Sequence, residues 1–425
     1  MKTAAIFLII ICLSVAWLGK LQAEEILTWQ ACLAEAKKNH PDLIFAAESI
    51  NEEKAGKAIA ASGLYPQIEA ALGASTTETE ASGGSKTTTD SYSYGLSGSQ
   101  LIFDGLKTIN EIKTAGQNLK VAEENYRFVS SGIRLDLRTA FINLLKTQEL
   151  VRVAEDIVKI RRDSLMLITL RYESGLEHKG ALLTAQANLA EAEFALAQAK
   201  RDIEFTQRQL TKEMGRREFK PLFVKGDFIV RETAKEKPDF QDIVKKHPSV
   251  LQAAYRINSA ALGVQSAYGN FAPEISGSAS AGKSSTHWPP ENDRWSLGLS
   301  LNMPIFEGGL KTAQLSQAKA LYNQAEVNAR SISDAAIVNL EQNWVTLQDA
   351  IETVQVRAKS LEATVERSRI AEAQYSTGFI NFDNWIIIEN DLVSAKKNYL
   401  QAQANALLAE AGWIQAKGET LEYAQ

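Results

Sequence analysis

The feature that most constrains this chain is an internal repeat. Short motifs of the first half return in the second half in the same order, at offsets of 203 to 207 residues. KKNHPDL returns as KKHPSVL, GLYPQIE as NFAPEIS, LIFDG as PIFEGG, and RYESGL as QYSTGF. Ordered matches at a nearly constant offset are hard to obtain by chance, so we expect one structural unit to occur twice.

The start of the chain has the pattern of a secretory signal peptide. Lys2 supplies a positive charge, the apolar run Ala4–Gly19 follows, and Ala23 offers a small residue at a cleavage point. That run is too short and wrongly flanked for a good stop-transfer helix. We therefore expect the protein to leave the cytoplasm and Cys32, the one cysteine left after cleavage, to be a buried apolar residue. The expected segments are a signal peptide at 1–23, a first repeat at 24–215, a connecting or equatorial segment at 216–238, and a second repeat at 239–425.

Each repeat is predicted to contain a helix, two strands, a very long helix, a turn and a returning helix. The first helix is expected at Trp29–Ser62, with Thr28 as its N-cap. No proline interrupts Lys107–Glu173 or Leu310–Ser376, and each of these helices would be about 100 Å long. Strands with period-two alternation are expected within about 66–104 and 273–306, with polar tips at Thr79–Asp90 and Lys283–Asp293.

The apolar spacing of the returning helices explains how such long helices are stabilised. In the first repeat, five apolar residues are seven positions apart, and small residues follow three positions after the first four of them. These residues are Leu182, Leu189, Leu196, Ile203 and Leu210, followed by Ala185, Ala192, Ala199 and Thr206. A period of 3.5 residues is typical of a coiled-coil seam, and alanine at the seam allows backbones to approach closely.

Composition narrows the function. Lys and Arg total 46 and Asp and Glu total 51, a net charge of −5, which argues against a general nucleic-acid binder. Two cysteines and four scattered histidines leave little room for a metal site. The sequence has no nucleophile motif, phosphate loop or metal-ligand spacing, so we expect no enzyme activity and no cofactor.

The predicted strands carry an apolar face, which is unusual in a secreted chain. We predict that six of its residues face lipid: Tyr92, Tyr94, Trp295, Leu297, Leu299 and Leu301. Four strands cannot close a barrel, because the smallest membrane barrels have about eight. Three chains with four strands each would close a twelve-stranded barrel that leaves no backbone group unpaired in lipid.

The repeated motifs resemble those of the TolC-like outer-membrane efflux protein family, and the resemblance covers nearly the whole chain after the signal peptide. It rests on KKNHPDL, on the strand-to-helix junctions LIFDG and PIFEGG, and on the helix turns RYESGL and QYSTGF. The resemblance implies a mainly α-helical homotrimer whose twelve-stranded β-barrel in outer-membrane lipid continues into a twelve-helix periplasmic α-barrel. It implies a Gram-negative outer membrane, a periplasmic adaptor and an inner-membrane RND or ABC transporter as partners.

The implied function is the exit duct of a tripartite efflux pump or a type I secretion system. The alternative is a non-transport periplasmic coiled-coil protein with a structural or adaptor role. The duplicated pattern with strands favours the duct, because an adaptor would have one helical hairpin with other β segments around it.

The resemblance also implies roles for the two helix turns. Adaptor-contact tips are expected at Gly175, Leu176, Gly378 and Phe379. Candidate residues of the entrance gate are Tyr172, Tyr375, Asp383, Asn384 and Glu389. The family often has acidic residues six and nine positions after the second tip glycine, where this chain has Asn384 and Ile387. That departure puts a cation-sensitive acidic ring in doubt.

Overall fold

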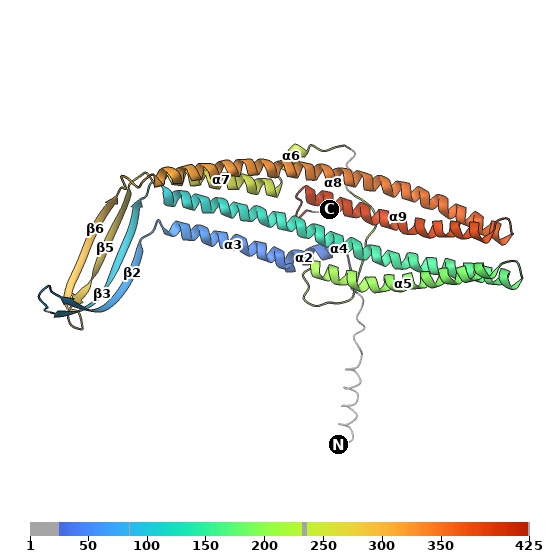
Figure 1. Cartoon of the computed structure of the whole chain (residues 1–425), viewed down its shortest axis with the longest axis horizontal. Helices are drawn as coiled ribbons and strands as arrows, with labels where there is room; N and C mark the ends of the chain where they lie inside the picture. The colour runs from blue at the N-terminus through green and yellow to red at the C-terminus, as the bar shows by residue number, and fades with distance from the viewer. Residues whose placement is uncertain (1–24, 85, 232–235, 424–425) are drawn as a thin grey trace, which may run out of the picture.

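The computed structural model describes residues 25–84, 86–231 and 236–423. The predicted signal peptide, residues 1–23, lies outside the described residues. The molecule is elongated, with a sheet at one end and a long body of helices that leads away from it (Figure 1). Within the described part of the chain, no helix is both long and apolar enough to cross a membrane.

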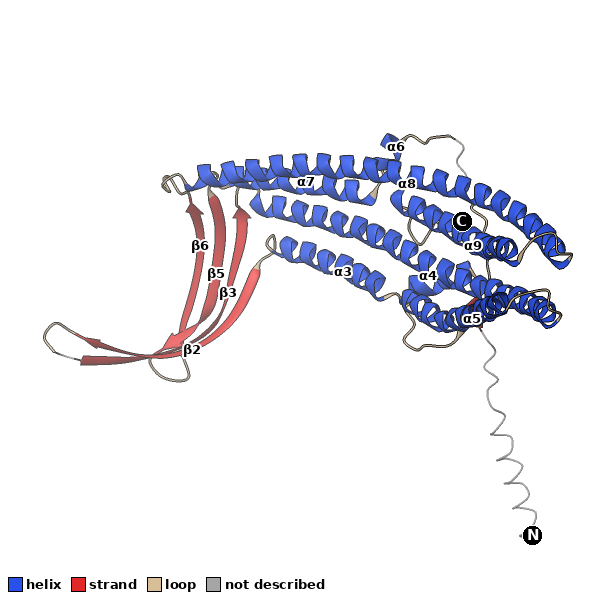
Figure 2. Ribbon diagram, turned by 45° about the vertical axis from the view of Figure 1, so that its right-hand side comes forward, coloured by secondary structure: helices blue, strands red, loops and turns tan. Residues whose placement is uncertain are grey.

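The two halves contain the same main series of elements (Figure 2). The first half comprises β1 (Glu25–Leu27), α2 (Trp29–Asn39), α3 (Pro41–Ser62), β2 (Gln67–Glu80), β3 (Lys86–Phe103), α4 (Lys107–Glu173) and α5 (Lys179–Glu213). The second half comprises β4 (Leu222–Val224), α6 (Phe240–Val244), α7 (Pro248–Gly269), β5 (Glu274–Ser285), β6 (Asn292–Asn302), α8 (Leu310–Ser376) and α9 (Phe382–Ala416). The long helices α4 and α8 have the predicted bounds and 67 residues each.

The prediction of one continuous helix over Trp29–Ser62 is wrong, because the chain breaks at His40 into α2 and α3. Pro41 has no amide hydrogen, and its ring disfavours the helical conformation for the residue before it. His40 is accordingly extended, and its Nδ1 accepts a hydrogen bond from the Asp42 amide at 3.3 Å. His247 caps α7 in the same way, so both repeats use a His-Pro pair to start a helix.

The four long strands form one antiparallel sheet in the order β2-β3-β5-β6. The β3–β5 pair joins the two halves of the chain, and β2 and β6 are the open edges of the sheet. Strands β2 and β3 extend further than predicted and pair as far as Glu80 and Lys86, inside the expected polar tip. Strand β6 ends at Asn302, earlier than predicted, and Pro304 cannot donate a backbone hydrogen bond to a ladder.

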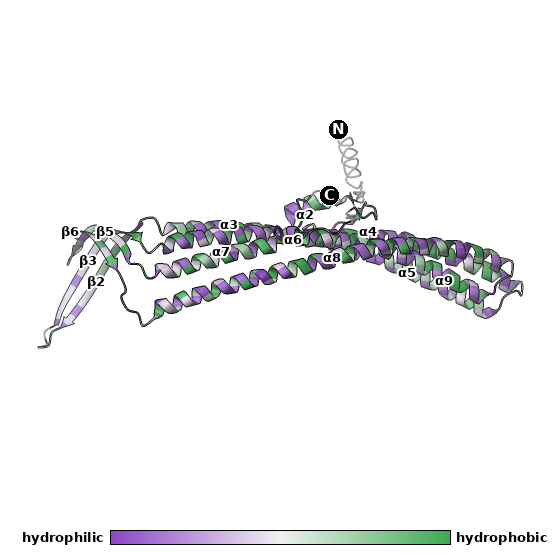
Figure 3. Ribbon diagram, turned by 90° about the horizontal axis from the view of Figure 1, so that it is seen from above, coloured by the Kyte–Doolittle hydropathy of each residue, from purple (hydrophilic) through white to green (hydrophobic). Residues whose placement is uncertain are grey.

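The long helices pack as two hairpins, and the hairpins contact each other through α4 and α9. Helix α4 runs along α5 and α8 runs along α9, while α4 also contacts α9 and so joins the hairpins. Apolar and polar segments alternate along all of the long helices (Figure 3). At the predicted seam of α5, Ala185, Ala192 and Ala199 are buried, whereas Leu182 and Leu189 are half-buried. The small residues therefore form the close-packed line of this coiled coil.

A separate core lies near the middle of the helical body, where β1 pairs in parallel with β4. Its buried side chains include Leu137, Leu144, Leu210 and Leu222. Cys32 belongs to the same cluster and is fully buried, and this burial raises the pKa of its thiol to about 12. The prediction of a buried, apolar Cys32 is thus confirmed.

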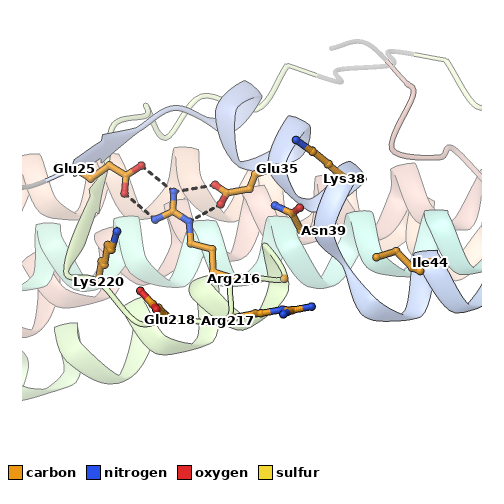
Figure 4. A pocket seen from close by; sticks show the side chains of 10 residues that line it. Glu25, Glu35, Lys38, Asn39, Ile44, Arg216, Arg217, Glu218 and Lys220 are labelled. Atoms are coloured by element: carbon orange, nitrogen blue, oxygen red, sulfur yellow. Dashed lines mark hydrogen bonds and ion pairs between the residues drawn. The ribbon is translucent and has the colours of Figure 1, made fainter.

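Arg216, which follows the end of α5, forms hydrogen bonds with residues of β1 and α2 (Figure 4). Its guanidinium group donates hydrogen bonds to both carboxylate oxygens of Glu25, at 2.7 and 2.8 Å, and to both of Glu35, at 2.6 and 2.8 Å. These bonds border a cavity of about 600 Å³. The hydrogen bond from Arg216 lowers the pKa of Glu25, and the two carboxylates raise the pKa of Arg216. The interaction positions β1 for its pairing with β4.

We predict that Arg216→Met lowers the thermal stability of the protein in detergent at pH 7, by about 1 to 3 kcal/mol, because it leaves Glu25 and Glu35 without their shared partner. The stabilisation of a carboxylate with a lowered pKa is present above its ordinary value of 4.5 and is lost as the pH falls through the lowered pKa. The difference between wild type and variant should therefore shrink between pH 5 and pH 3.

The control is Lys245→Met, which removes an ion pair with Asp242 whose two side chains are both mostly exposed. It should change the melting temperature little at either pH. A variant Arg216→Met that melts like the wild type at pH 7 would contradict the role given to Arg216.

Candidate functional site

Both helical hairpins reverse at a glycine, at the end of the molecule opposite the sheet (Figure 1). Gly175 has φ +75° and Gly378 has φ +82°, a left-handed conformation that side chains with a Cβ atom resist. The Leu176 amide donates to the Arg171 carbonyl at 2.8 Å, and the Phe379 amide donates to the Gln374 carbonyl at 2.8 Å. This pattern satisfies the last carbonyls of each long helix and ends it abruptly.

The residue after each tip glycine is apolar and lies in solvent. Leu176 is 66% exposed and Phe379 is 84% exposed. Three residues after each glycine, His178 and Asn381 start the returning helices by accepting hydrogen bonds from the Ala181 and Asn384 amides. Each tip is thus a short, well-capped turn that carries one exposed apolar side chain.

Residues of both turns meet at Tyr375. Its ring is fully buried and stacks on Trp385, with centroids 4.4 Å apart and an interplanar angle of 11°. Its hydroxyl donates to Glu177 at 2.9 Å, and the Arg171 guanidinium lies 4.7 Å from the ring centroid. Arg171 also donates to the Tyr375 carbonyl at 3.1 Å. Burial and the hydrogen bond to Glu177 raise the pKa of Tyr375.

The two tyrosines that the repeat makes equivalent therefore differ. Tyr172 is 38% exposed, while Tyr375 holds the first turn to the second. Sequence reasoning found both tyrosines but missed Arg171, Glu177 and Trp385. A signal existed only for Trp385, which occupies the seam position that Leu182 occupies in the first repeat.

The residues of α9 that were expected near the entrance differ in how exposed they are. Asp383 and Asn384 are exposed in the first turn of α9, and Ile387 is exposed one turn later. Glu389 was expected near the entrance but is buried, with 4% of its surface exposed, and accepts a hydrogen bond from the Ser368 hydroxyl at 2.6 Å. Burial raises the pKa of Glu389. The side chain thus packs between α8 and α9, beside Ser368.

The sheet register places the predicted lipid-facing residues on one face. Tyr94 lies opposite Lys283, and two positions further along the strands Leu96 lies opposite Ala281, which lies opposite Trp295. Directly opposed residues of an antiparallel sheet point to the same side. The face so defined, the apolar face, includes Tyr92, Tyr94, Trp295, Leu297, Leu299 and Leu301.

These residues are unequally exposed. The four residues of β6 are 65% to 81% exposed, whereas Tyr92 is half-buried beside Trp288, with ring centroids 6.3 Å apart. The opposite face, the polar face, is mostly serine, threonine and glycine, with hydroxyl contacts between Ser276 and Ser300 at 2.7 Å and between Ser280 and Ser296 at 2.8 Å. The sheet is therefore amphipathic from edge to edge.

Among the described residues, no group of three His, Cys, Asp or Glu side chains is arranged to hold a metal ion.

Comparison with known sequences gives the family. A profile described as "Outer membrane efflux protein" matches residues 32–216 and 240–419, which is most of the chain. The chain belongs to the outer membrane efflux protein family. Among curated relatives, it is 22% identical over 416 residues to the outer membrane efflux protein BepC of Brucella suis, covering 92% of this chain and 87% of BepC. It is 25% identical over 406 residues to SilC of Salmonella typhimurium, a probable outer membrane lipoprotein, covering 91% and 84%.

Solved structures give the same fold. A crystal structure of CusC superposes with a TM-score of 0.82 at 18% identity, covering 91% of each chain. The outer-membrane channel OprN superposes with a TM-score of 0.81 at 17% identity, covering 92% of this chain and 89% of that one. The fold is TolC-like. As a family member the protein is an outer-membrane efflux channel with a large periplasmic part, and a non-transport coiled-coil role is not favoured.

We predict that a charged residue destabilises the protein on the apolar face of the sheet but not on the polar face, even at adjacent positions of β6. Leu299→Arg should destabilise the protein in vesicles by about 2 to 4 kcal/mol if this residue contacts lipid near the bilayer midplane. Ser300→Arg, on the polar face, is the matched control and should have a small effect. The measurement is denaturant unfolding in lipid vesicles, and equal costs at the two positions would refute the assignment of faces.

Proposed function

We propose that three copies of this chain form a continuous duct through the outer membrane and periplasm. The observation that carries the proposal is the open, amphipathic sheet. Strands β2 and β6 have unpaired edges, and an apolar face with open edges would promote aggregation in water. In lipid each unpaired backbone group costs several kcal/mol. Pairing of β6 with β2 of the next copy removes all edges, and three copies give twelve strands.

The helical hairpins support the same assembly. Each chain offers α4, α5, α8 and α9, so three chains would form a twelve-helix tube that continues the barrel. Exposed apolar residues on the outer helices, including Phe194 and Phe205 of α5 and Val356 of α8, would be covered by the neighbouring copies. The polar face of the sheet would then line the pore, and the apolar face would contact outer-membrane lipid.

The tips are proposed to contact a periplasmic adaptor that connects the duct to an inner-membrane RND or ABC transporter. Leu176 and Phe379 gain nothing from exposure to water, so their exposure is consistent with a partner surface. In a trimer six similar tips would face a ring of adaptor hairpins, and weak contacts at each tip would add up.

Tyr172, Asp383 and Asn384 would lie at the entrance of the duct, and the Tyr375 contacts would hold this entrance closed. The same duct would serve efflux or type I secretion.

Edge pairing can be tested with cysteines, because the native Cys32 is buried. A variant with Ser75→Cys on β2 and Ser296→Cys on β6 should form a three-chain species with a short bismaleimide in detergent. Either substitution alone should give at most two linked chains. A protein that keeps its helical circular dichroism as a stable monomer would contradict the trimer.

Tip contact can be tested separately from assembly. Leu176→Asp combined with Phe379→Asp should reduce efflux on the order of tenfold, because the loss is repeated at six tips, and should leave the trimer in the outer membrane. The matched control, Leu176→Met with Phe379→Leu, keeps both side chains apolar and should transport normally. Full activity of the aspartate variant at a normal trimer level would place adaptor contact elsewhere.

A further inference from the structure

Charged residues are rare on the polar face of the sheet. In the described strands this face carries three: Glu69 of β2, opposite Ser97; Glu274 of β5, opposite Asn302; and Arg294 of β6, opposite Gly282. The other charged residues of the four strands belong to the apolar face, near the end of the sheet away from the helices. A charge on the polar face therefore stands out against serine, threonine and glycine.

The three charges differ in position and partners. Glu274 forms an ion pair with Lys107 at 3.6 Å and begins β5 beside the helices. Glu69 is the third residue of β2, also at the helical end. Arg294 is the third residue of β6, which begins at the far end of the sheet, and it is exposed and has no ion pair among the described residues. The outer part of this face thus has one unpaired cation per chain.

The strands beside Arg294 leave room for a bound group. Gly282 lies directly opposite Arg294, and Gly95 lies opposite Gly282 on the next strand, so no side chain covers the guanidinium from that side. The backbones approach closely there, since a Cβ atom on Gly95 would lie 2.8 Å from the Ala281 carbonyl oxygen. A hollow of about 380 Å³ is lined by these glycines, by Arg294, and by several serines that include Ser93 and Ser284.

This arrangement suits an anion. A guanidinium group offers five donors in a plane and binds carboxylate, phosphate or sulfonate oxygens in pairs. The serine hydroxyls around it can donate further hydrogen bonds, and no carboxylate of the polar face lies in the lining of the hollow.

We propose that Arg294, with Ser93 and Ser284, forms an anion-binding site on the pore wall, which takes solutes through their carboxylate, phosphate or sulfonate groups. The site rests on the proposed trimer, in which three copies would form a positive ring near the outer mouth. A ring of one sign in a narrow passage raises the local concentration of counter-ions. The outer part of the duct would therefore favour anionic solutes.

The test uses the full-length trimer in planar bilayers, with pyrophosphate as the probe. Pyrophosphate added from the outer side reaches Arg294 without passing the helical tips. We expect Arg294→Ser to lower the chloride-to-potassium permeability ratio in 0.1 M KCl by about twofold or more, and to weaken pyrophosphate block on the order of tenfold. In 1 M KCl, where charges are screened within about 3 Å, the difference in permeability should nearly vanish.

Two further variants test whether the effect depends on the guanidinium group and whether it is specific to the polar face. Arg294→Lys keeps the charge and should retain most of the permeability ratio, with weaker block because the planar donors are lost. Lys86→Ser is the matched control, since Lys86 lies on the apolar face, outside the lining of the hollow, and pairs with Glu78 at 2.8 Å. It should behave as the wild type in both measurements.

Calorimetry on the purified trimer at low salt separates this proposal from the duct itself. Pyrophosphate should bind the wild type and Lys86→Ser alike and bind Arg294→Ser on the order of tenfold more weakly. Equal binding and equal block in all variants would overturn the anion site. A wild type that forms no channel would contradict the duct, and the calorimetric comparison would still decide whether Arg294 binds anions.

Discussion

The close seam between the helices is the interaction on which the rest of the structure depends. Helix α4 has 67 residues and is not enclosed by a compact domain. Packing against the neighbouring helices is therefore the main source of its stability. In α5 the buried line is alanine, so the backbones of α4 and α5 approach closely along much of their length. This contact sets the separation of the helices and carries the turn at Gly175 to a fixed distance from the sheet. The position of every proposed tip residue follows from it.

The sheet imposes the opposite kind of constraint, because it is incomplete within one chain. The helices satisfy their own backbone hydrogen bonds, whereas β2 and β6 each leave one edge unpaired. An amphipathic sheet with two open edges requires more strands, and an apolar outer face requires lipid or protein. The family membership and the fold agree with the strand pattern on an outer-membrane channel. In the proposed trimer, the charged residues of the polar face would be part of the pore wall.

Duplication gave the chain two similar hairpins that have since diverged. The tip turns are nearly identical in backbone, with a left-handed glycine and the same pair of amide hydrogen bonds. The side chains differ, because Tyr375 is buried against Trp385 and contacts Glu177 and Arg171 of the first turn. One hairpin thus holds the other, so the two repeats are not equivalent at the tips.

The sequence alone determined the local and periodic features. The extent of α4 and α8 and the shared face of Trp295, Leu297 and Leu299 follow from helical patterning and from a period of two, and the turns follow from the left-handed conformation that glycine allows; all of these depend on backbone geometry rather than on contacts. The tertiary structure decided what periodicity cannot encode. It buried Glu389 against Ser368, joined Tyr375 to residues about 200 positions away, and placed Arg294 opposite Gly282, which in turn lies opposite Gly95. Such contacts depend on which elements become neighbours in space, and register and packing settle that only after the chain has folded.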